Sequence, residues 1–165
     1  MQKHLYFVCP SDYLETVIDK TFRQENYYCT SLGNSMVFDL DTVEEIIKLL
    51  KSKNINEVSF VLSDDNSIVQ DALEKQDFSG ITVLNDFYDK IIAHQEHSEV
   101  SWQICNRKFL ILSYHLNNKI KELKLGLKTI YFNGLKINGL IYKRQENIFQ
   151  DIYSDLICRE FFYLN

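Results

Sequence analysis

Apolar and polar positions along the first half of the chain repeat with the periods of a strand and then of a helix. The run from His4 to Cys9 is short and apolar and ends at Pro10, as expected for a buried strand that reaches the edge of a sheet. From Tyr13 to Arg23 the apolar residues recur at helical spacing, with Ser11 or Asp12 placed to cap the helix. This part of the pattern predicts a strand followed by a helix.

The same order returns three times further along the chain. Asp41 to Lys53 has a capping residue, acids in its first turn, an apolar stripe and lysines at its end, which together predict a helix. Before it, Gly33 and Asn34 mark a turn because both residues tolerate positive φ. The other elements that the pattern predicts here are strands at 27–30, 57–62 and 81–84 and helices at 67–74 and 86–94.

The last third of the chain predicts one long helix and a hairpin. Apolar residues keep a helical period from Phe109 to Leu127, and two strand-like runs, Leu135 to Tyr142 and Asn147 to Tyr153, flank a polar turn. Strands that alternate with helices imply parallel pairing. We therefore expect an α/β fold: a mostly parallel sheet of about four to five strands flanked by helices, with an edge hairpin near the C-terminus.

Composition narrows the function classes. With five glycines and one proline, the 165 residues contain no linker-like segment, so we expect a single domain over 1–165. The net charge of −5 and the pI near 5.4 argue against nucleic-acid binding. No apolar run approaches the roughly 20 residues that span a bilayer, so we expect a cytoplasmic protein without membrane insertion. The four cysteines form no CxxC pair, and we expect free thiols.

In a parallel sheet, function gathers at the carboxyl ends of the strands. Three such ends carry the segments Cys9-Pro10-Ser11-Asp12-Tyr13, Thr30-Ser31-Leu32-Gly33-Asn34 and Ser63-Asp64-Asp65-Asn66-Ser67. Together with the Gly139-x-x-Tyr142 strand and the helix before it, their order resembles that of the β-class carbonic anhydrases. The resemblance covers most of the chain and implies the fold of that family and a homodimer.

The resemblance also implies a damaged zinc site. The family binds zinc through two cysteines and one histidine, and the matching positions here are Cys9, Asp64 and Ser67. A serine hydroxyl stays protonated near neutral pH and replaces a thiolate poorly. The family's aspartate and arginine in the first turn are replaced by Ser11 and Tyr13, with Asp12 one residue from the needed place and Arg23 as the nearest arginine in sequence.

We therefore expect a carbonic anhydrase-like protein without an intact zinc site, a non-catalytic module that binds or regulates. The resemblance suggests a small anion such as bicarbonate, or a protein partner such as an anion transporter. We expect no catalytic residue, no bound metal and no cofactor. The candidate pocket consists of Cys9, Ser11, Asp12, Gly33, Asn34, Asp64, Asn66 and Ser67.

Two other interpretations stay open at this point. The first is a zinc metalloenzyme, a carbonate dehydratase or related hydrolase, with an altered ligand set built from Cys9, Asp64 and a distant histidine such as His115. The second is an unrelated flavodoxin-like or receiver-like domain that uses Asp64 and Asp65, in which the C-terminal hairpin would not pack beside the parallel sheet. A simple capping loop also explains Asp64 and Asp65.

Overall fold

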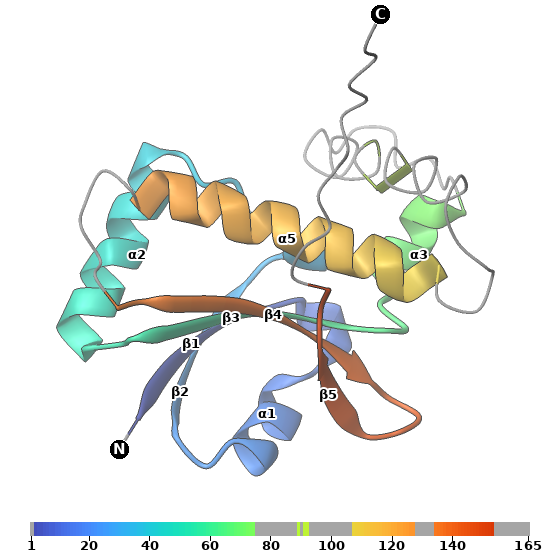
Figure 1. Ribbon diagram of the computed structural model, residues 1–165, viewed down its shortest axis with the longest axis horizontal. Helices are drawn as coiled ribbons and strands as arrows, with labels where there is room; N and C mark the ends of the chain where they lie inside the picture. Colours follow the sequence, from blue (N-terminus) through green and yellow to red (C-terminus); the bar gives the residue numbers. More distant parts are fainter. Residues whose placement is uncertain (1, 75–88, 90, 93–106, 128–133, 154–165) are drawn as a thin grey trace, which may run out of the picture.

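The fold is built around one five-stranded sheet, as a computed structural model of the chain shows (Figure 1). The structure describes residues 2–74, 89, 91–92, 107–127 and 134–153. The strand order is β2-β1-β3-β4-β5. The strands are β1 (Lys3–Val8), β2 (Glu25–Thr30), β3 (Glu57–Ser63), β4 (Lys136–Lys143) and β5 (Ile148–Asp151).

Strand direction confirms the predicted fold class. β1 runs parallel to both β2 and β3, and β4 runs parallel to β3. Among the described strands, only the β4–β5 pair is antiparallel, and it forms the expected C-terminal hairpin. Because β4 pairs with β3, the hairpin packs beside the parallel sheet, which is contrary to what the flavodoxin-like or receiver-like alternative predicts.

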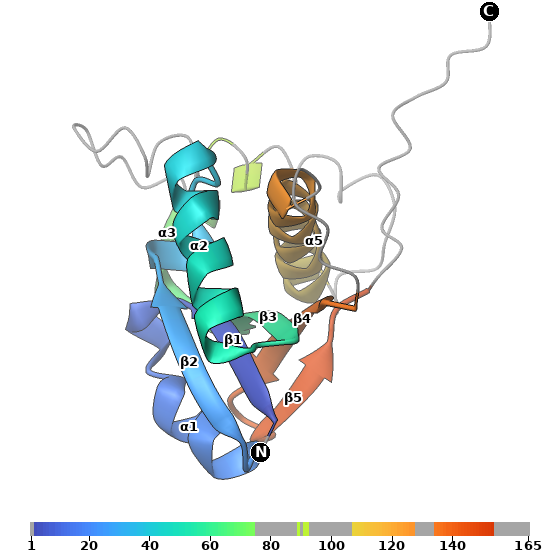
Figure 2. The same cartoon turned by 90° about the vertical axis from the view of Figure 1, so that its left-hand side faces the viewer.

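Helices cover both faces of the sheet and bury a core on each side (Figures 1 and 2). One face carries α2 (Leu40–Lys53), α3 (Ser67–Leu73) and α5 (Arg107–Leu127), and α1 (Glu15–Thr21) lies on the other. Alternate residues of β1 point to opposite sides, so Leu5 and Phe7 join the larger core under α2 and α5. Tyr6 and Val8 pack in the smaller core beneath α1.

Local sequence signals explain where α2 lies. Its N-cap, Asp39, accepts a hydrogen bond from the Thr42 amide at 2.9 Å, and Asn54 ends it in the left-handed conformation. α5 approaches α2 closely at Gly126, where a Cβ atom would lie only 2.7 Å from Cγ2 of Val43. A side chain at this position would push the two helices apart.

Several predicted boundaries move, and some predictions lie outside the described residues. The first helix begins at Glu15 instead of Tyr13, because a short 3-10 turn at Pro10–Asp12 comes first. The predicted strand at 81–84 lies outside the described residues. Of the predicted helix at 86–94, residues 89, 91 and 92 are described, and all three are helical. No described helix is long and apolar enough to cross a membrane.

Candidate functional site

Cys9 lies at the carboxyl end of β1 and joins two of the three loops that the sequence singled out. Its side chain is fully buried, and its Sγ accepts a hydrogen bond from the Gly33 amide at 3.0 Å. A second hydrogen bond links Sγ to the Ser11 hydroxyl, also at 3.0 Å. Gly33 takes a φ of 58°, so the turn brings its amide to the sulfur without steric cost. The thiol is therefore held inside the protein by its neighbours.

Asp12 joins the first loop to the third. Its Oδ2 accepts a hydrogen bond from the Ser63 amide at 2.8 Å, and its Oδ1 accepts one from Nδ2 of Asn66 at 2.7 Å. Burial raises the pKa of this carboxyl to about 6, although both hydrogen bonds and the nearby Arg144 lower it. The expectation that Ser11 or Asp12 caps the first helix is wrong: the N-cap is Leu14, with no side-chain hydrogen bond.

Asn66 bonds to the Asp12 carboxylate and caps a helix at the same time. Its Nδ2 donates to Asp12, while its Oδ1 accepts from the Val69 amide at 2.9 Å and so caps α3. Ser67, the next residue, is exposed at the first position of α3. The capping interpretation of this loop is thus correct in kind, with Asn66 as the capping residue.

Arg144 is the site residue that the sequence did not reveal. It follows β4 in the turn of the C-terminal hairpin, and its backbone amide donates to Oδ1 of Asp64 at 3.2 Å. Its Nε donates to the Asp65 carboxylate at 2.8 and 3.1 Å, and its Nη2 donates to the Asp12 carbonyl at 3.0 Å. Asp64 and Asp65 therefore contact the hairpin, and the arginine beside Asp12 comes from a position 132 residues away in sequence.

The second loop lies beneath α5. Nε2 of the buried His115 donates to the Gly33 carbonyl at 2.8 Å, which fixes the loop from above. The buried Asn34 donates from Nδ2 to the Val61 carbonyl at 2.9 Å, and its backbone amide donates to Ser31. The Gly33 and Asn34 amides, which could have held an anion, are therefore both bonded within the protein.

The site residues do not fit the zinc set that the resemblance implies. Cys9 Sγ is buried and bonded to Gly33 and Ser11, Asp64 accepts from Arg144, and the hydroxyl at position 67 is exposed. Within the described ranges, no group of three or more His, Cys, Asp or Glu residues is placed to hold a metal ion. In particular, Cys9, Asp64 and His115 do not come together as the altered ligand set would require.

Comparison with known proteins rests on structure. No protein-family model matches the sequence, and no curated protein matches it significantly. A β-carbonic anhydrase of Sordaria macrospora, described as tetrameric, superposes with a TM-score of 0.72 at 16% identity, covering 92% of this chain and 80% of that one. The β-carbonic anhydrase CafD of Aspergillus fumigatus gives 0.72 at 17% identity, covering 93% and 90%.

A more distant comparison leads to the same fold. The Coccomyxa β-carbonic anhydrase, solved in complex with acetazolamide, superposes with a TM-score of 0.67 at 10% identity over 92% of this chain and 72% of that one. The agreement extends over nearly the whole chain and includes enzymes from different organisms. This chain therefore has the fold of the β-carbonic anhydrases.

Proposed function

We propose that this protein is a carbonic anhydrase-like binding or regulatory module that does not carry out zinc-hydroxide chemistry. The observation that carries the proposal is the bridge in which the Asp12 carboxylate accepts from both Ser63 and Asn66. A metal site needs lone pairs that face an open coordination position. At this edge of the sheet, both oxygens of the Asp12 carboxylate and the Cys9 sulfur already accept hydrogen bonds from protein donors.

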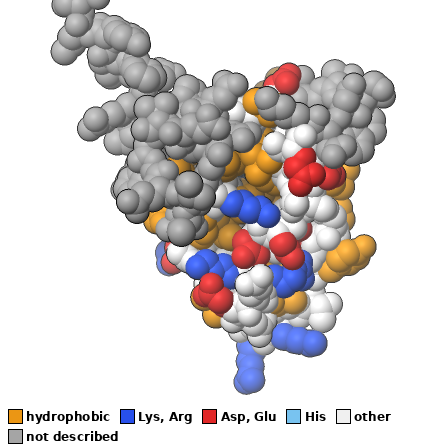
Figure 3. All heavy atoms as spheres, turned by 90° about the vertical axis from the view of Figure 1, so that its right-hand side faces the viewer, with side chains coloured by type: hydrophobic (Ala, Val, Ile, Leu, Met, Phe, Trp, Pro, Cys, Tyr) orange, Lys and Arg blue, Asp and Glu red, His pale blue; other side chains and the backbone are white. Residues whose placement is uncertain are grey.

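Charge favours a protein partner over a small anion. Asp12, Asp64 and Asp65 gather at the carboxyl edge, and Arg144 already pairs with Asp65 at 2.8 Å. Figure 3 shows acidic and basic side chains side by side on the described part of one molecular face. An excess of carboxylates repels bicarbonate, whereas mixed hydrogen-bonding groups suit a polar protein surface. We therefore favour a protein partner that carries basic groups.

The decisive experiment combines metal analysis with a carbon dioxide hydration assay on protein purified without chelators. We expect less than stoichiometric zinc and no turnover above buffer, in both the wild type and Cys9→Ala. Cys29→Ala is the matched control, because Cys29 is a half-buried free cysteine in β2 outside the three loops. One zinc per chain with turnover, both lost in Cys9→Ala and kept in Cys29→Ala, would overturn the proposal in favour of the metalloenzyme.

A bicarbonate titration separates the two kinds of ligand. If the site is built for a protein surface, bicarbonate added at physiological concentration leaves the amide resonances of Gly33 and Ser63 unchanged. Saturable shifts at these amides, growing stronger in Asp12→Asn because one repelling carboxylate is gone, would identify a small-anion site instead.

Self-association is the remaining part of the proposal. The Sordaria macrospora enzymes of the same fold are described as tetrameric. We propose that this chain also forms an oligomer, of which a homodimer is the smallest form. Light scattering coupled to size exclusion over a range of concentrations measures its mass directly, and a monomer of 19.5 kDa at every concentration would contradict it.

A further inference from the structure

A second group of buried polar side chains lies away from the carboxyl edge, on the α1 face of the sheet. Nε2 of His4 on β1 lies 2.8 Å from the Ser59 hydroxyl on β3, and that hydroxyl also contacts Oδ1 of Asn138 on β4. On the other side of the ring, Nδ1 of His4 lies 3.5 Å from Oε2 of Glu57. His4 and Ser59 are buried, whereas Asn138 is exposed. A continuous chain of polar atoms thus leads from the interior to the surface.

The order hydroxyl, imidazole, carboxylate is also that of a serine hydrolase. Ser59, however, has no exposed surface, and Asn138 lies against its oxygen. A nucleophile has to reach its substrate, which the buried Ser59 hydroxyl does not. We therefore read these atoms as a hydrogen-bond chain in which a change at one end alters which atom donates at the other, and not as an acyl-transfer site. What the chain can do depends on which of its atoms donate and which accept.

We propose that His4, Ser59 and Asn138 form a proton-linked hydrogen-bond chain in which the charge on the His4 ring sets the orientation of the exposed Asn138 amide. A hydroxyl has one proton to donate, so each bond in the chain fixes the direction of the next. The Glu57 carboxylate can only accept, so Nδ1 of His4 carries the proton that faces it. Nδ1 makes no hydrogen bond within the described residues, so a proton there faces the carboxylate across 3.5 Å, whereas the opposite tautomer would direct the Nδ1 lone pair at it.

The two charge states of the ring then require opposite amide orientations. In the neutral ring with its proton on Nδ1, Nε2 accepts, so Ser59 donates to it and the Ser59 oxygen is left to accept from the Asn138 NH₂ group. In the protonated ring Nε2 donates to Ser59, whose proton then goes to the Asn138 oxygen, which is the atom placed against Ser59 in the structure. The oxygen and nitrogen of such an amide are assigned from the hydrogen-bond network. Protonation of His4 therefore rotates the Asn138 amide by half a turn.

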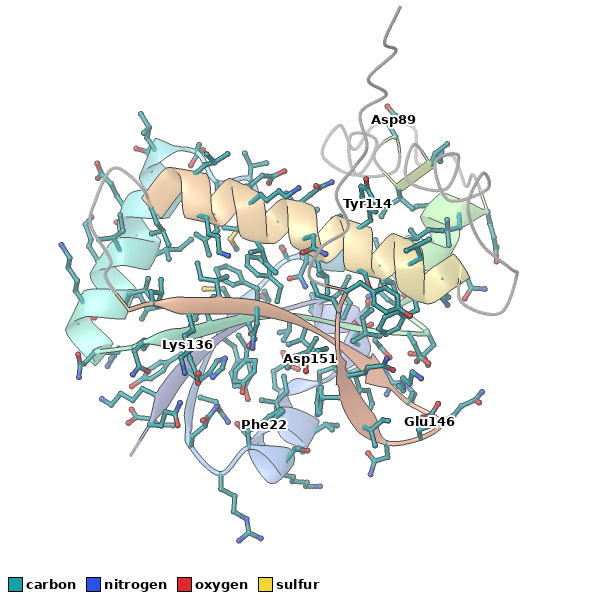
Figure 4. All side chains as sticks on the ribbon, viewed as in Figure 1. Phe22, Asp89, Tyr114, Lys136, Glu146 and Asp151 are labelled. Carbon is teal, nitrogen blue, oxygen red and sulfur yellow. The ribbon has the colours of Figure 1, made fainter. Side chains whose placement is uncertain are left out.

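The surroundings favour the neutral ring at neutral pH. Burial lowers the pKa of His4, and Glu57 opposes this only in part. Glu57 also accepts from Nε2 of Gln2 at 2.6 Å and lies 3.6 Å from Nζ of Lys136 on β4. Figure 4 shows Lys136 on the same side of the sheet as Phe22 of the segment that follows α1.

The remaining neighbours of the ring have other partners. The Tyr6 ring stacks on His4 with centroids 4.1 Å apart, and its hydroxyl accepts from Gln24. On β2, Asn26 lies in register with His4, but its Nδ2 donates to Asp19 of α1 at 2.8 Å. Glu57 is therefore the charged group that faces the His4 ring most directly among the described residues.

Nuclear magnetic resonance of the wild type tests the proposal. A long-range proton–nitrogen spectrum is expected to show the Nδ1-protonated tautomer of His4 above its transition, with a midpoint below 6.5. The side-chain NH₂ resonances of Asn138 should shift with the same midpoint, while those of Asn26, bonded to Asp19, should not. In Ser59→Ala, His4 should still titrate, but the Asn138 amide should no longer follow it.

Three results would overturn the proposal. One is a neutral His4 that carries its proton on Nε2, and another is an Asn138 amide that does not respond in the wild type. The third is covalent labelling of Ser59 by a fluorophosphonate, which would identify the chain as a hydrolase site. The first two tests use the wild type, so they hold even if Ser59→Ala folds poorly.

Discussion

The carboxyl edge and the α1 face of the same sheet both bury polar side chains, but they satisfy them in different ways. At the edge, the acceptor-only Asp12 carboxylate is bonded to a backbone amide and to an Asn66 side chain that also caps a helix. On the α1 face, His4, Ser59 and Asn138 can each donate or accept. The ionised Asp12 carboxylate therefore has one arrangement of hydrogen bonds, whereas the α1 face has two.

The same physical cause gives the two regions opposite responses to pH. Burial disfavours the charged form of both groups, so it raises the pKa of Asp12 to about 6 and lowers that of His4. Lowering the pH from 7 therefore raises the contribution of Asp12 to the free energy of unfolding and lowers that of His4. The variants below separate these contributions.

The largest expected effect is that of Asn66→Ala. It removes the cap on Val69 and one of the donors to the buried Asp12 carboxylate. A lost cap costs about 1 kcal/mol and an unsatisfied buried acceptor about 1–3, so we expect the free energy of unfolding to fall by about 2–4 kcal/mol. Asp39→Ala, which loses only the cap on Thr42 at α2, should cost about 1 kcal/mol.

Urea unfolding of both variants at pH 7 measures this difference. Equal losses in Asn66→Ala and Asp39→Ala would mean that the bridge to Asp12 contributes nothing to stability. In that case the contrast between the edge and the α1 face would be one of geometry alone.

The next effect is a pH dependence that comes from Asp12. Its pKa is about 6 in the folded protein, against an ordinary value of 3.8, so the folded state holds this proton more tightly than the unfolded state. The contribution is fully present below pH 3.8 and is lost as the pH rises through 6. A shift of this size corresponds to about 3 kcal/mol.

Unfolding of the wild type and Asp12→Asn between pH 4 and 7.5 isolates that contribution, because His4 titrates in both proteins. We expect the stability of the wild type, relative to the variant, to fall by about 2 kcal/mol across the range, because part of the full contribution is already lost at pH 4. A constant difference between the two proteins would contradict the raised pKa of Asp12.

These contrasts also show what the sequence could predict. Periodicity was enough for the sheet and its main helices, because apolar spacing within an element directly reports which face is buried. Among the candidate residues, Gly33 bonds to Cys9 and Asn66 bonds to Asp12, since parallel strands end at one edge. Local patterns therefore identified which loops meet at the carboxyl edge of the sheet.

What the sequence could not predict are partners that lie far apart along the chain. Arg144 reaches Asp12 from the C-terminal hairpin, so a search limited to neighbours in sequence found only Arg23. The single apolar run that contains His4 gave no sign of Ser59 on a strand 55 residues away. Such contacts depend on register, which sequence periodicity does not fix across a parallel crossover.

A smaller effect is expected on the α1 face from Ser59→Ala. It removes the hydroxyl between His4 and Asn138 and leaves the buried Nε2 without its partner, which should cost about 1–2 kcal/mol at pH 7.5. Ser113→Ala is the matched control, because that buried hydroxyl has no hydrogen-bond partner among the described residues. Its loss should leave the stability unchanged or slightly increased, as chemical denaturation can measure. Equal effects in the two variants would show that the Ser59 hydroxyl bonds add nothing.

The smallest expected effect comes from Arg144→Ala. The guanidinium and the Asp65 carboxylate are 43% and 52% exposed, so solvent screens their ion pair and the loss should stay below about 1 kcal/mol at low salt. The same side chain also donates to the Asp12 carbonyl, so hydrogen exchange at the Ser63 amide should accelerate slightly. Lys143→Ala, which loses a surface pair with Glu146, should leave that exchange rate unchanged.

The salt dependence of Arg144→Ala distinguishes its two contacts with the edge. A loss of stability that disappears at about 1 M salt belongs to the exposed ion pair, because the Debye length at that salt concentration is about 3 Å. Faster exchange at Ser63 that persists in high salt belongs to the hydrogen bond on the Asp12 carbonyl. In that second case the hairpin helps to keep the edge in its single arrangement, which the α1 face, with its two interchangeable hydrogen-bond directions, does not need.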